Sequence, residues 1–259
     1  MKNQYKEYYR KPIRKVVKSF VRKKIPLTVC IAAIYNNNAI LGASDRMVTL
    51  GYGEWTYEPP ITKIIRLTNS IAVLTAGDQN IQMQVYKEVE KLVRARIDRE
   101  PDNWWEIADV AKLYSKCFRE LKNKLLGEQV LYKYGLTLNS FIARQKTMHD
   151  KFLDKLQGEI DTFEISGIET IITGIDDLGP HIYVITNGGI SCEDRSGFAA
   201  IGIGSVHAIS HFMLTKYSAS ASESKALITI HQAKKKSEVA SGVGVDTDMC
   251  VIGPLKGSF

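Results

Sequence analysis

The chain has 259 residues, of which 44% are hydrophobic, so it can form a sizeable core and is not a wholly disordered protein. Its four cysteines, Cys30, Cys117, Cys192 and Cys250, lie far apart without a CxxC pair, which argues against a zinc site or a disulfide framework. This cysteine usage predicts a reducing, cytoplasmic location. No apolar run approaches the roughly 20 residues that cross a bilayer, so no membrane span is predicted.

The formal charge of +7 is concentrated at the N-terminus. Residues 1–27 hold ten Lys and Arg residues against Glu7 alone, which leaves 25 basic and 27 acidic residues for 28–259. We therefore expect a basic extension at 1–27 and one domain at 28–259, with no nucleic-acid binding by that domain. Apolar residues at helical spacing within 13–21 are typical of a basic amphipathic helix, and a solvated extension is the alternative.

The predicted elements begin at residue 28. Two apolar runs separated by YNNNA predict a strand pair within 28–45. A second strand pair is predicted within 62–76, and we expect it to lie in the same sheet as the first. Because the run VCIAAI is almost continuously apolar, both faces of its strand should be covered.

The middle of the chain changes to a helical period. Apolar residues spaced by three and four predict one helix around 85–93 and another around 107–121. The charged and apolar stretch at 138–157 is predicted to be a third helix. Strands are predicted to return in the segments 169–175, 181–186 and 197–204.

The last third of the domain is predicted to end in two helices and a strand. One helix is expected around 205–217, and the next begins near Ser220, which forms a capping-box spacing with Glu223. The segment 247–253 reads as the final strand. Strands and helices thus come in separate runs, which predicts an α+β fold and not a parallel doubly wound sheet.

Five segments resemble, in order and spacing, the successive signatures of proteasome β-type subunits, especially the small bacterial and archaeal proteasome-like proteins that begin Met-Thr-Val-Cys-Ile-Ala. They are TVCIAAIYNNNAILGASDRMVT, TKIIRLTNSIAVLTAGD, TGIDDLGPHIYVITNGG, FAAIGIGSVHA and SEVASGVGVDTDMCVIG. The resemblance covers nearly all of 28–259. It implies the fold of N-terminal-nucleophile (Ntn) hydrolases, a four-layer αββα sandwich of two antiparallel sheets between helix layers.

The resemblance also implies a catalytic site. Thr28 is similar to the family's nucleophile, which is the first residue of the mature chain and uses its own α-amine as base. A threonine hydroxyl needs such a base, and an α-amine with a pKa of about 7.7–8.0 is partly neutral at working pH. Asp45 and Lys63 resemble the charged pair beside the nucleophile, and Gly77 resembles the residue whose backbone N–H forms the oxyanion hole.

Two further positions resemble the groups around the amine, and three features depart from the family pattern. Glu238 and Ser241 are similar to the acid and the serine that hydrogen-bond there, although the family has aspartate where Glu238 stands. Ile203 replaces the serine of the family's Gly-Ser-Gly. The turn at 36–38 is about one residue longer than in standard β subunits, which leaves the register of Thr28 against its aspartate open.

Each candidate residue also fits an ordinary structural role when it is taken alone. Thr28 is a β-branched residue at a strand start, and Asp45 could form a strand-end ion pair. Lys63 could be the polar position of a strand, and Gly77 a turn residue. Cys30 is interpreted as a core residue and not as a nucleophile. It is the joint occurrence at family spacing that favours a site.

Four interpretations of residues 1–27 stay open. They could be a propeptide removed by self-cleavage at Leu27–Thr28, or a retained extension of a non-catalytic subunit. They could be a tether to a membrane or a nucleic acid. They could also be absent from the cell, if translation starts at Leu27 and removal of that residue exposes Thr28.

We therefore predict a threonine peptidase that cleaves amide bonds in peptides or unfolded protein and forms a ring-like homo-oligomer, with no metal or cofactor. The alternative is a catalytically inactive proteasome-like assembly subunit that retains its extension. A binding module that acts through the basic arm is the third hypothesis. The natural substrate, the ring size and an ATPase partner are not determined by the sequence.

Overall fold

A computed structural model describes residues 26–50, 55–100, 105–165 and 167–253. The helix predicted within 13–21 lies outside these residues. Among them, no helix is both long enough and apolar enough to span a membrane.

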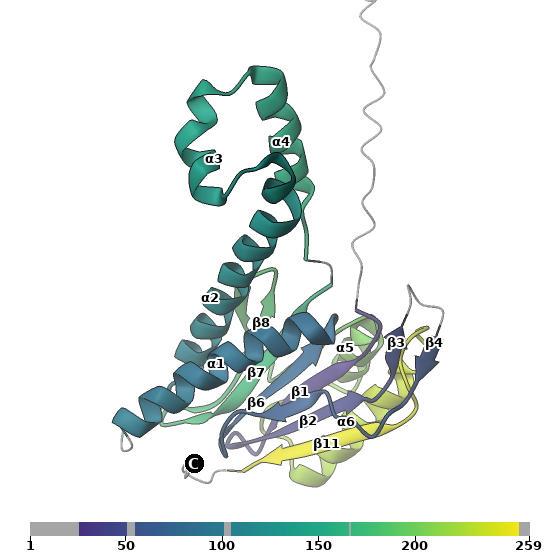
Figure 1. The fold of residues 1–259 in the computed structure, drawn as a ribbon. Coiled ribbons are helices and arrows are strands. Elements are labelled where there is room, and N and C mark those ends of the chain that lie inside the picture. The colour runs from purple at the N-terminus through teal and green to yellow at the C-terminus, as the bar shows by residue number, and fades with distance from the viewer. Residues whose placement is uncertain (1–25, 51–54, 101–104, 166, 254–259) are drawn as a thin grey trace, which may run out of the picture.

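Two antiparallel sheets form the centre of the molecule (Figure 1). The first has the strand order β10-β1-β2-β11 and the second the order β5-β6-β7-β8-β9, whereas β3 and β4 form a separate two-stranded sheet. The bounds are β1 Cys30–Tyr35, β2 Ala39–Asp45, β3 Val48–Leu50, β4 Trp55–Tyr57, β5 Ile64–Arg66, β6 Ile71–Ala76, β7 Glu169–Asp176, β8 Gly179–Thr186, β9 Gly189–Cys192, β10 Phe198–Ile201 and β11 Thr247–Ile252.

The sheet assignment of the second strand pair was wrong. β5 and β6 form a hairpin as predicted, but they belong to the five-stranded sheet and not to the sheet of β1 and β2. The physical reason is that strands of both sheets are apolar on two faces, so their sequences do not indicate which sheet they join. The two sheets instead face each other across a shared core, to which Cys30 and Ala32 contribute from one side and Leu74 and Ile171 from the other.

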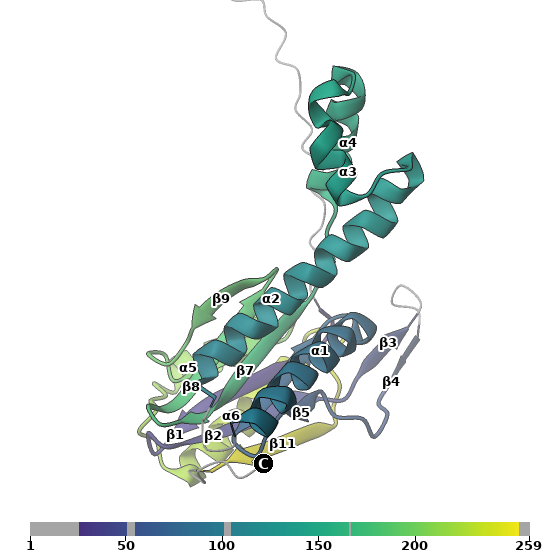
Figure 2. The same ribbon diagram turned by 60° about the vertical axis from the view of Figure 1, so that its left-hand side comes forward.

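Helices cover the outer faces of both sheets (Figure 2). α1 (Gln79–Arg99) and α2 (Ile107–Leu126) pack on the five-stranded sheet, where Val89 and Tyr114 meet Val73 and Ile172. α5 (Ser205–Leu214) and α6 (Glu223–Ser237) pack on the four-stranded sheet. The layers are therefore helices, sheet, sheet and helices, which confirms an α+β fold with antiparallel sheets.

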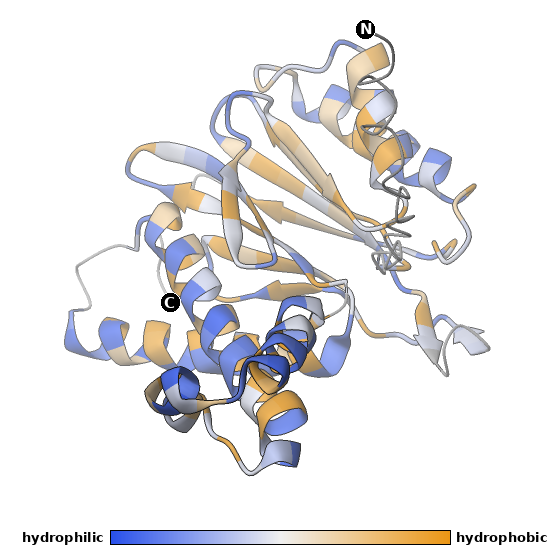
Figure 3. Cartoon of the chain, turned by 90° about the horizontal axis from the view of Figure 1, so that it is seen from above, coloured by the Kyte–Doolittle hydropathy of each residue, from blue (hydrophilic) through white to orange (hydrophobic). Residues whose placement is uncertain are grey.

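β1 shows why its sequence is continuously apolar. All six of its residues are buried. Cys30, Ala32 and Ile34 face the other sheet, whereas Ile31 and Ala33 face the helix layer. Strand residues alternate between two covered faces, so both must be apolar, as expected from the run VCIAAI. In Figure 3 the apolar colours accordingly run along the strands, while the helices carry many hydrophilic residues.

The segment after α2 projects away from the two sheets (Figure 1). It consists of the short helices η2 Gly127–Leu131, η3 Tyr132–Tyr134, α3 Leu138–Arg144 and η4 Gln145–Thr147, followed by α4 Asp150–Thr162. The predicted helix at 138–157 is therefore broken: the backbone is extended at Met148, and the His149 side chain accepts from the Lys151 N–H to cap a new helix.

We expect the projecting segment to be dispensable for folding of the body. Its small core, built around Leu131 and Leu156, forms a cluster of its own, and Leu126 and Phe163 at its two ends lie in that cluster. Replacing 128–162 by a short Gly/Ser linker should shift the thermal midpoint of unfolding by less than about 5 °C. Circular dichroism melting tests this, and loss of a cooperative transition would contradict it.

Two helix limits differ from the predictions near the end of the chain. α5 ends at Leu214, because Lys216 has a positive φ of 48° and cannot continue a helix. The side chain that caps α6 is Ser222, which accepts from the Lys225 N–H, and not Ser220. Ser220 is instead hydrogen-bonded to Ser218.

Candidate active site

The turn between β1 and β2 sets the register on which the site depends. Asn36 and Asn37 have φ values of 50° and 56°, and the Asn38 N–H closes the turn on the Tyr35 oxygen at 3.1 Å. Asparagine tolerates this left-handed conformation better than most residues. The turn pairs Cys30 with Ser44, so Asp45 lies opposite the residue that follows Thr28.

Asp45 is fully buried at the end of β2 and collects hydrogen bonds on both carboxylate oxygens. Its Oδ1 accepts from the Val29 N–H at 2.9 Å. Its Oδ2 accepts from the Met47 N–H at 3.1 Å and from the Gly244 N–H at 3.0 Å. Backbone donors of this kind stabilise the ionised carboxylate and hold it in one orientation.

Thr28 and Lys63 complete a buried cluster around Asp45. The Thr28 hydroxyl donates to Asp45 Oδ1 and accepts from Lys63 Nζ at 2.5 Å. Lys63 Nζ also lies 2.9 Å from Asp45 Oδ1. Thr28, Asp45 and Lys63 are exposed by only 2%, 0% and 7%, so water screens this ion pair weakly. The cluster thus places a charged donor and a charged acceptor on one hydroxyl.

The glycines around Ile203 allow the backbone to approach Thr28 closely. Gly202 has a φ of +84°, and a Cβ there would lie 2.3 Å from the Thr28 carbonyl oxygen. The Gly204 N–H donates to the same oxygen at 3.2 Å. Only glycine fits position 202, because both the space and the conformation exclude a side chain.

The two residues before Thr28 pack against two loops: Pro26 contacts the loop that holds Ile203, and Leu27 contacts the loop after α6. The Pro26 carbonyl oxygen accepts from the Thr28 N–H at 3.0 Å and from the Ile203 N–H at 2.8 Å. A Cβ at Gly242 would lie 2.7 Å from the Leu27 Cβ. The nitrogen of Thr28 is therefore an amide within this chain, and it becomes an amine only if the bond between Leu27 and Thr28 is cut.

The other three candidate residues do not contact the Thr28 hydroxyl. Gly77 follows β6 at the end where the Thr75 N–H donates to the Lys63 carbonyl at 3.1 Å, so it lies at the same end of the sheet as the cluster. Ser241 is exposed in the turn after α6. Glu238 caps the end of α6 and pairs with lysines of that helix, and among the described residues no hydrogen bond joins it to Thr28.

Gly77 has a conformation that only glycine adopts easily. Its φ is +111°, and a Cβ there would lie 1.8 Å from the Gly167 carbonyl oxygen. A side chain at this position would force the chain away from the start of β7. The glycine therefore has a structural function, whatever its backbone N–H does.

The ionisation of Glu238 is governed by two opposing effects. Burial acts to raise its pKa, but hydrogen bonds from Lys234 and Lys235 outweigh burial and hold the pKa below the ordinary value of 4.5. The Glu238 carboxylate therefore forms ion pairs with the two lysines and not a contact with Thr28.

The low pKa of Glu238 predicts a loss of stability in acid. Because the pKa is lower in the folded state, the unfolded chain takes up the proton first, and stability falls as the pH drops below about 4.5. The variant Glu238→Gln has no proton to bind there. Its free energy of unfolding, measured with urea near neutral pH and at about pH 4, should fall less than that of the wild type. Equal losses would contradict the prediction.

Cys30 lies close to the cluster but is not suited to act as a nucleophile. Its thiol donates to the Thr75 carbonyl oxygen at 3.4 Å. Burial raises the pKa of Cys30 to about 12, and the nearby Lys63 ammonium offsets this only in part. A thiol with such a pKa is not ionised at neutral pH, and the thiolate is the reactive form.

The sequence patterns did not single out three residues that lie near the cluster. Gly244 donates to Asp45, Lys234 holds the loop that carries Gly244, and Glu169 Oε2 accepts from the Gly202 N–H at 2.7 Å. Lys234 lies in the run KKK, which is typical of a solvated helix face. Glu169 begins a strand with no local motif around it. Only the turn-rich sequence SGVGVDTD marks the loop of Gly244 as unusual.

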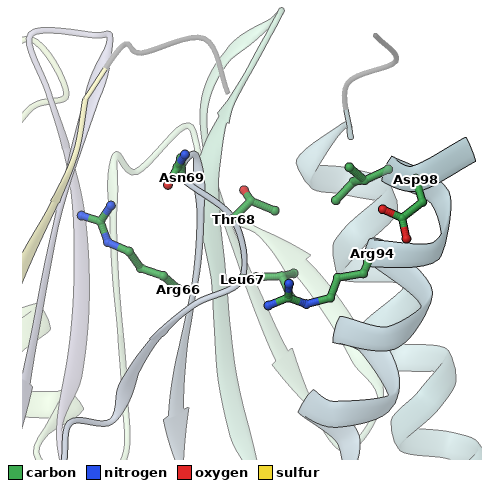
Figure 4. A pocket seen from close by; sticks show the side chains of 7 residues that line it. Arg66, Leu67, Thr68, Asn69, Arg94 and Asp98 are labelled. Carbon is green, nitrogen blue, oxygen red and sulfur yellow. The ribbon is translucent and has the colours of Figure 1, made fainter. Parts of the chain in front are cut away.

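The pocket in Figure 4 lies between the β5–β6 turn and α1, at the end of β5 away from Lys63, and contributes no residue to the cluster. It is lined by Arg66, Leu67, Thr68, Asn69, Arg94, Ile97 and Asp98. In the described part of the chain, no group of three or more His, Cys, Asp and Glu side chains could hold a metal ion.

Comparison with known proteins adds no family assignment. No protein-family model matches the chain, and no curated protein matches it significantly. The chemistry open to this chain therefore has to be inferred from the geometry of the cluster of Thr28, Asp45 and Lys63.

Proposed function

We propose that the protein is a threonine peptidase of the N-terminal-nucleophile type, acting on amide bonds in peptides or unfolded protein. The observation that carries the proposal is the Thr28 hydroxyl held between Lys63 and Asp45 in a buried site. The order of helix and sheet layers supports the four-layer αββα sandwich that the resemblance implies.

The cluster gives each residue a chemical role in this proposal. When the chain begins at Thr28, the free α-amine takes the hydroxyl proton, and Oγ1 attacks the substrate carbonyl. The Lys63 ammonium, 2.5 Å from Oγ1, stabilises the negative charge that develops on this oxygen. Asp45 holds the ammonium in place. The Gly77 N–H is proposed to bind the carbonyl oxygen. The α-ammonium returns the proton to the substrate nitrogen as the C–N bond breaks, so the amine product leaves and an ester remains on Thr28. Water then hydrolyses this ester, which releases the acid product and restores the hydroxyl.

A catalytically inactive assembly subunit is the second candidate function. The packing of Pro26 and Leu27 favours it, since Pro26 accepts two backbone hydrogen bonds and Leu27 fills the space beside Gly242. A retained extension would leave Thr28 without an amine. Ile203, in place of the family's serine, and the pairing of Glu238 with lysines also agree with this function.

The proposal extends to assembly and location through the resemblance alone. We propose a ring-forming homo-oligomer in the cytoplasm, with no cofactor. An ATPase that delivers unfolded substrate is compatible with such a ring. The resemblance does not identify that ATPase.

The deciding experiment compares the full chain with a chain that starts at Thr28. We expect the shorter chain to hydrolyse fluorogenic peptide amides and to be labelled on Thr28 by threonine-directed electrophiles. The full chain should be inert until the bond between Leu27 and Thr28 is cut, because only the cut supplies the base. Mass spectrometry of the native N-terminus accompanies the assays. If the native protein keeps its extension and the folded shorter chain is also inactive, the inactive-subunit function takes the place of the peptidase.

A further inference from the structure

Lys234 is a fully buried lysine in the last turn of α6. Its side chain has an exposed fraction of 0%, whereas that of its neighbour Lys235 is 48% exposed. Taking an ammonium group out of water is costly unless its charge is paired and its protons are all bonded. A buried lysine within a run of three lysines therefore requires a specific structural reason.

All three ammonium protons of Lys234 have acceptors within hydrogen-bond distance. Nζ lies 2.6 Å from Glu238 Oε1, 2.8 Å from the Gly244 carbonyl oxygen and 2.7 Å from the Val245 carbonyl oxygen. Glu238 supplies the compensating charge, and the two carbonyls belong to the loop between α6 and β11. The lysine thus ties the end of α6 to two consecutive residues of this loop.

The same loop contacts the Thr28 cluster from its other side. The Gly244 N–H donates to Asp45 Oδ2 at 3.0 Å, while the Gly244 carbonyl accepts from Lys234. One residue therefore joins the buried lysine to the carboxylate that holds Thr28 and Lys63. Glu58 packs on the loop so closely that a Cβ at Gly244 would lie 1.6 Å from its Oε1.

We propose that Lys234 is a positioning residue for the reaction: it holds the Gly244 N–H against Asp45 and so fixes the Thr28–Asp45–Lys63 cluster. The inference rests on the proposed peptidase function. Without Lys234, two loop carbonyls and Glu238 lose their shared donor, and the loop is free to move away from Asp45. A small displacement of a catalytic group is enough to slow a reaction by about 100-fold.

The test compares Lys234→Met with Lys235→Met. Each variant is made as the full chain and is assayed after the bond between Leu27 and Thr28 has been cut. Both variants remove one lysine that contacts Glu238, but only the first removes a donor to the loop. We expect Lys234→Met to lower kcat by at least about tenfold with KM changed less than about twofold, and Lys235→Met to leave both unchanged. Hydrogen exchange of the Gly244 amide should accelerate in Lys234→Met alone.

The outcomes separate this inference from the proposed function. If the wild type is inactive, the peptidase function fails. Independently of activity, an unchanged rate of hydrogen exchange of the Gly244 amide in Lys234→Met would show that Lys234 does not hold the loop, and would overturn the inference. If the wild type is active and Lys234→Met keeps its kcat while its thermal midpoint falls, Lys234 is only structural and the inference is wrong. Should Lys234→Met not fold, Lys234→Gln, which keeps N–H donors on a shorter side chain, must show the same fall in kcat.

Discussion

Replacing Thr28 by alanine should lower kcat/KM for peptide hydrolysis by a factor on the order of 10⁴ or more, because it removes the hydroxyl that lies between Lys63 and Asp45. The Lys63 ammonium then has no oxygen to activate. The substitution should leave the fold intact, since Asp45 keeps its ion pair with Lys63 and its three backbone donors. Steady-state kinetics on the chain that starts at position 28 measures the loss.

Thr28→Ser is the matched control for this prediction. Serine keeps the hydroxyl and the α-amine and removes only a methyl group, so most of the activity should survive. Labelling by threonine-directed electrophiles should persist in the serine variant and vanish in the alanine variant. Substantial hydrolysis by folded Thr28→Ala would exclude Thr28 as the nucleophile.

Replacing Asp45 by asparagine should lower the free energy of unfolding by about 3–5 kcal/mol, which is the range for breaking a buried ion pair from one side. Five groups donate to this carboxylate: the Thr28 hydroxyl, the Lys63 ammonium and the N–H groups of Val29, Met47 and Gly244. An asparagine amide has one oxygen and one NH₂ group, so in either orientation donors face donors. The buried Lys63 also loses its counter-charge.

Urea denaturation of full chains carrying Asp45→Asn and Asp246→Asn tests this argument. Asp246 is exposed and lies in the loop next to Val245, so its change to asparagine alters the same net charge without breaking the cluster. We expect the Asp246 variant to stay within about 0.5 kcal/mol of the wild type. A similarly small effect of Asp45→Asn would mean that the buried cluster contributes little to stability.

Much of the fold could be predicted from local patterns. The sequence predicted the hairpin of β1 and β2, the two long helices, the α+β class and the burial of both faces of β1. These features depend on residues near one another in the chain: a turn of asparagines, a period of two or a period of 3.6. The prediction of Thr28 and Asp45 as neighbours depended on the resemblance, and the hairpin register brings them together.

The sequence could not predict which sheet a strand joins or where a helix stops. The hairpin of β5 and β6 has the same apolar pattern as a strand pair of the other sheet, and only packing across the shared core decides its place. Likewise, the break at Met148 and the end of α5 depend on backbone conformations that no residue there makes obligatory.

The sequence by itself therefore determined most strands of the two large sheets, the long helices and, through the resemblance, three residues that the structure brings together: Thr28, Asp45 and Lys63. The tertiary structure alone decided what surrounds them. Glu238 pairs with Lys234 and Lys235 at ordinary helical spacing, but Lys234 is buried because the Gly244 and Val245 carbonyls supply its other two acceptors. These loop carbonyls reach Lys234 only through the tertiary fold, so no local pattern reveals that this lysine is buried.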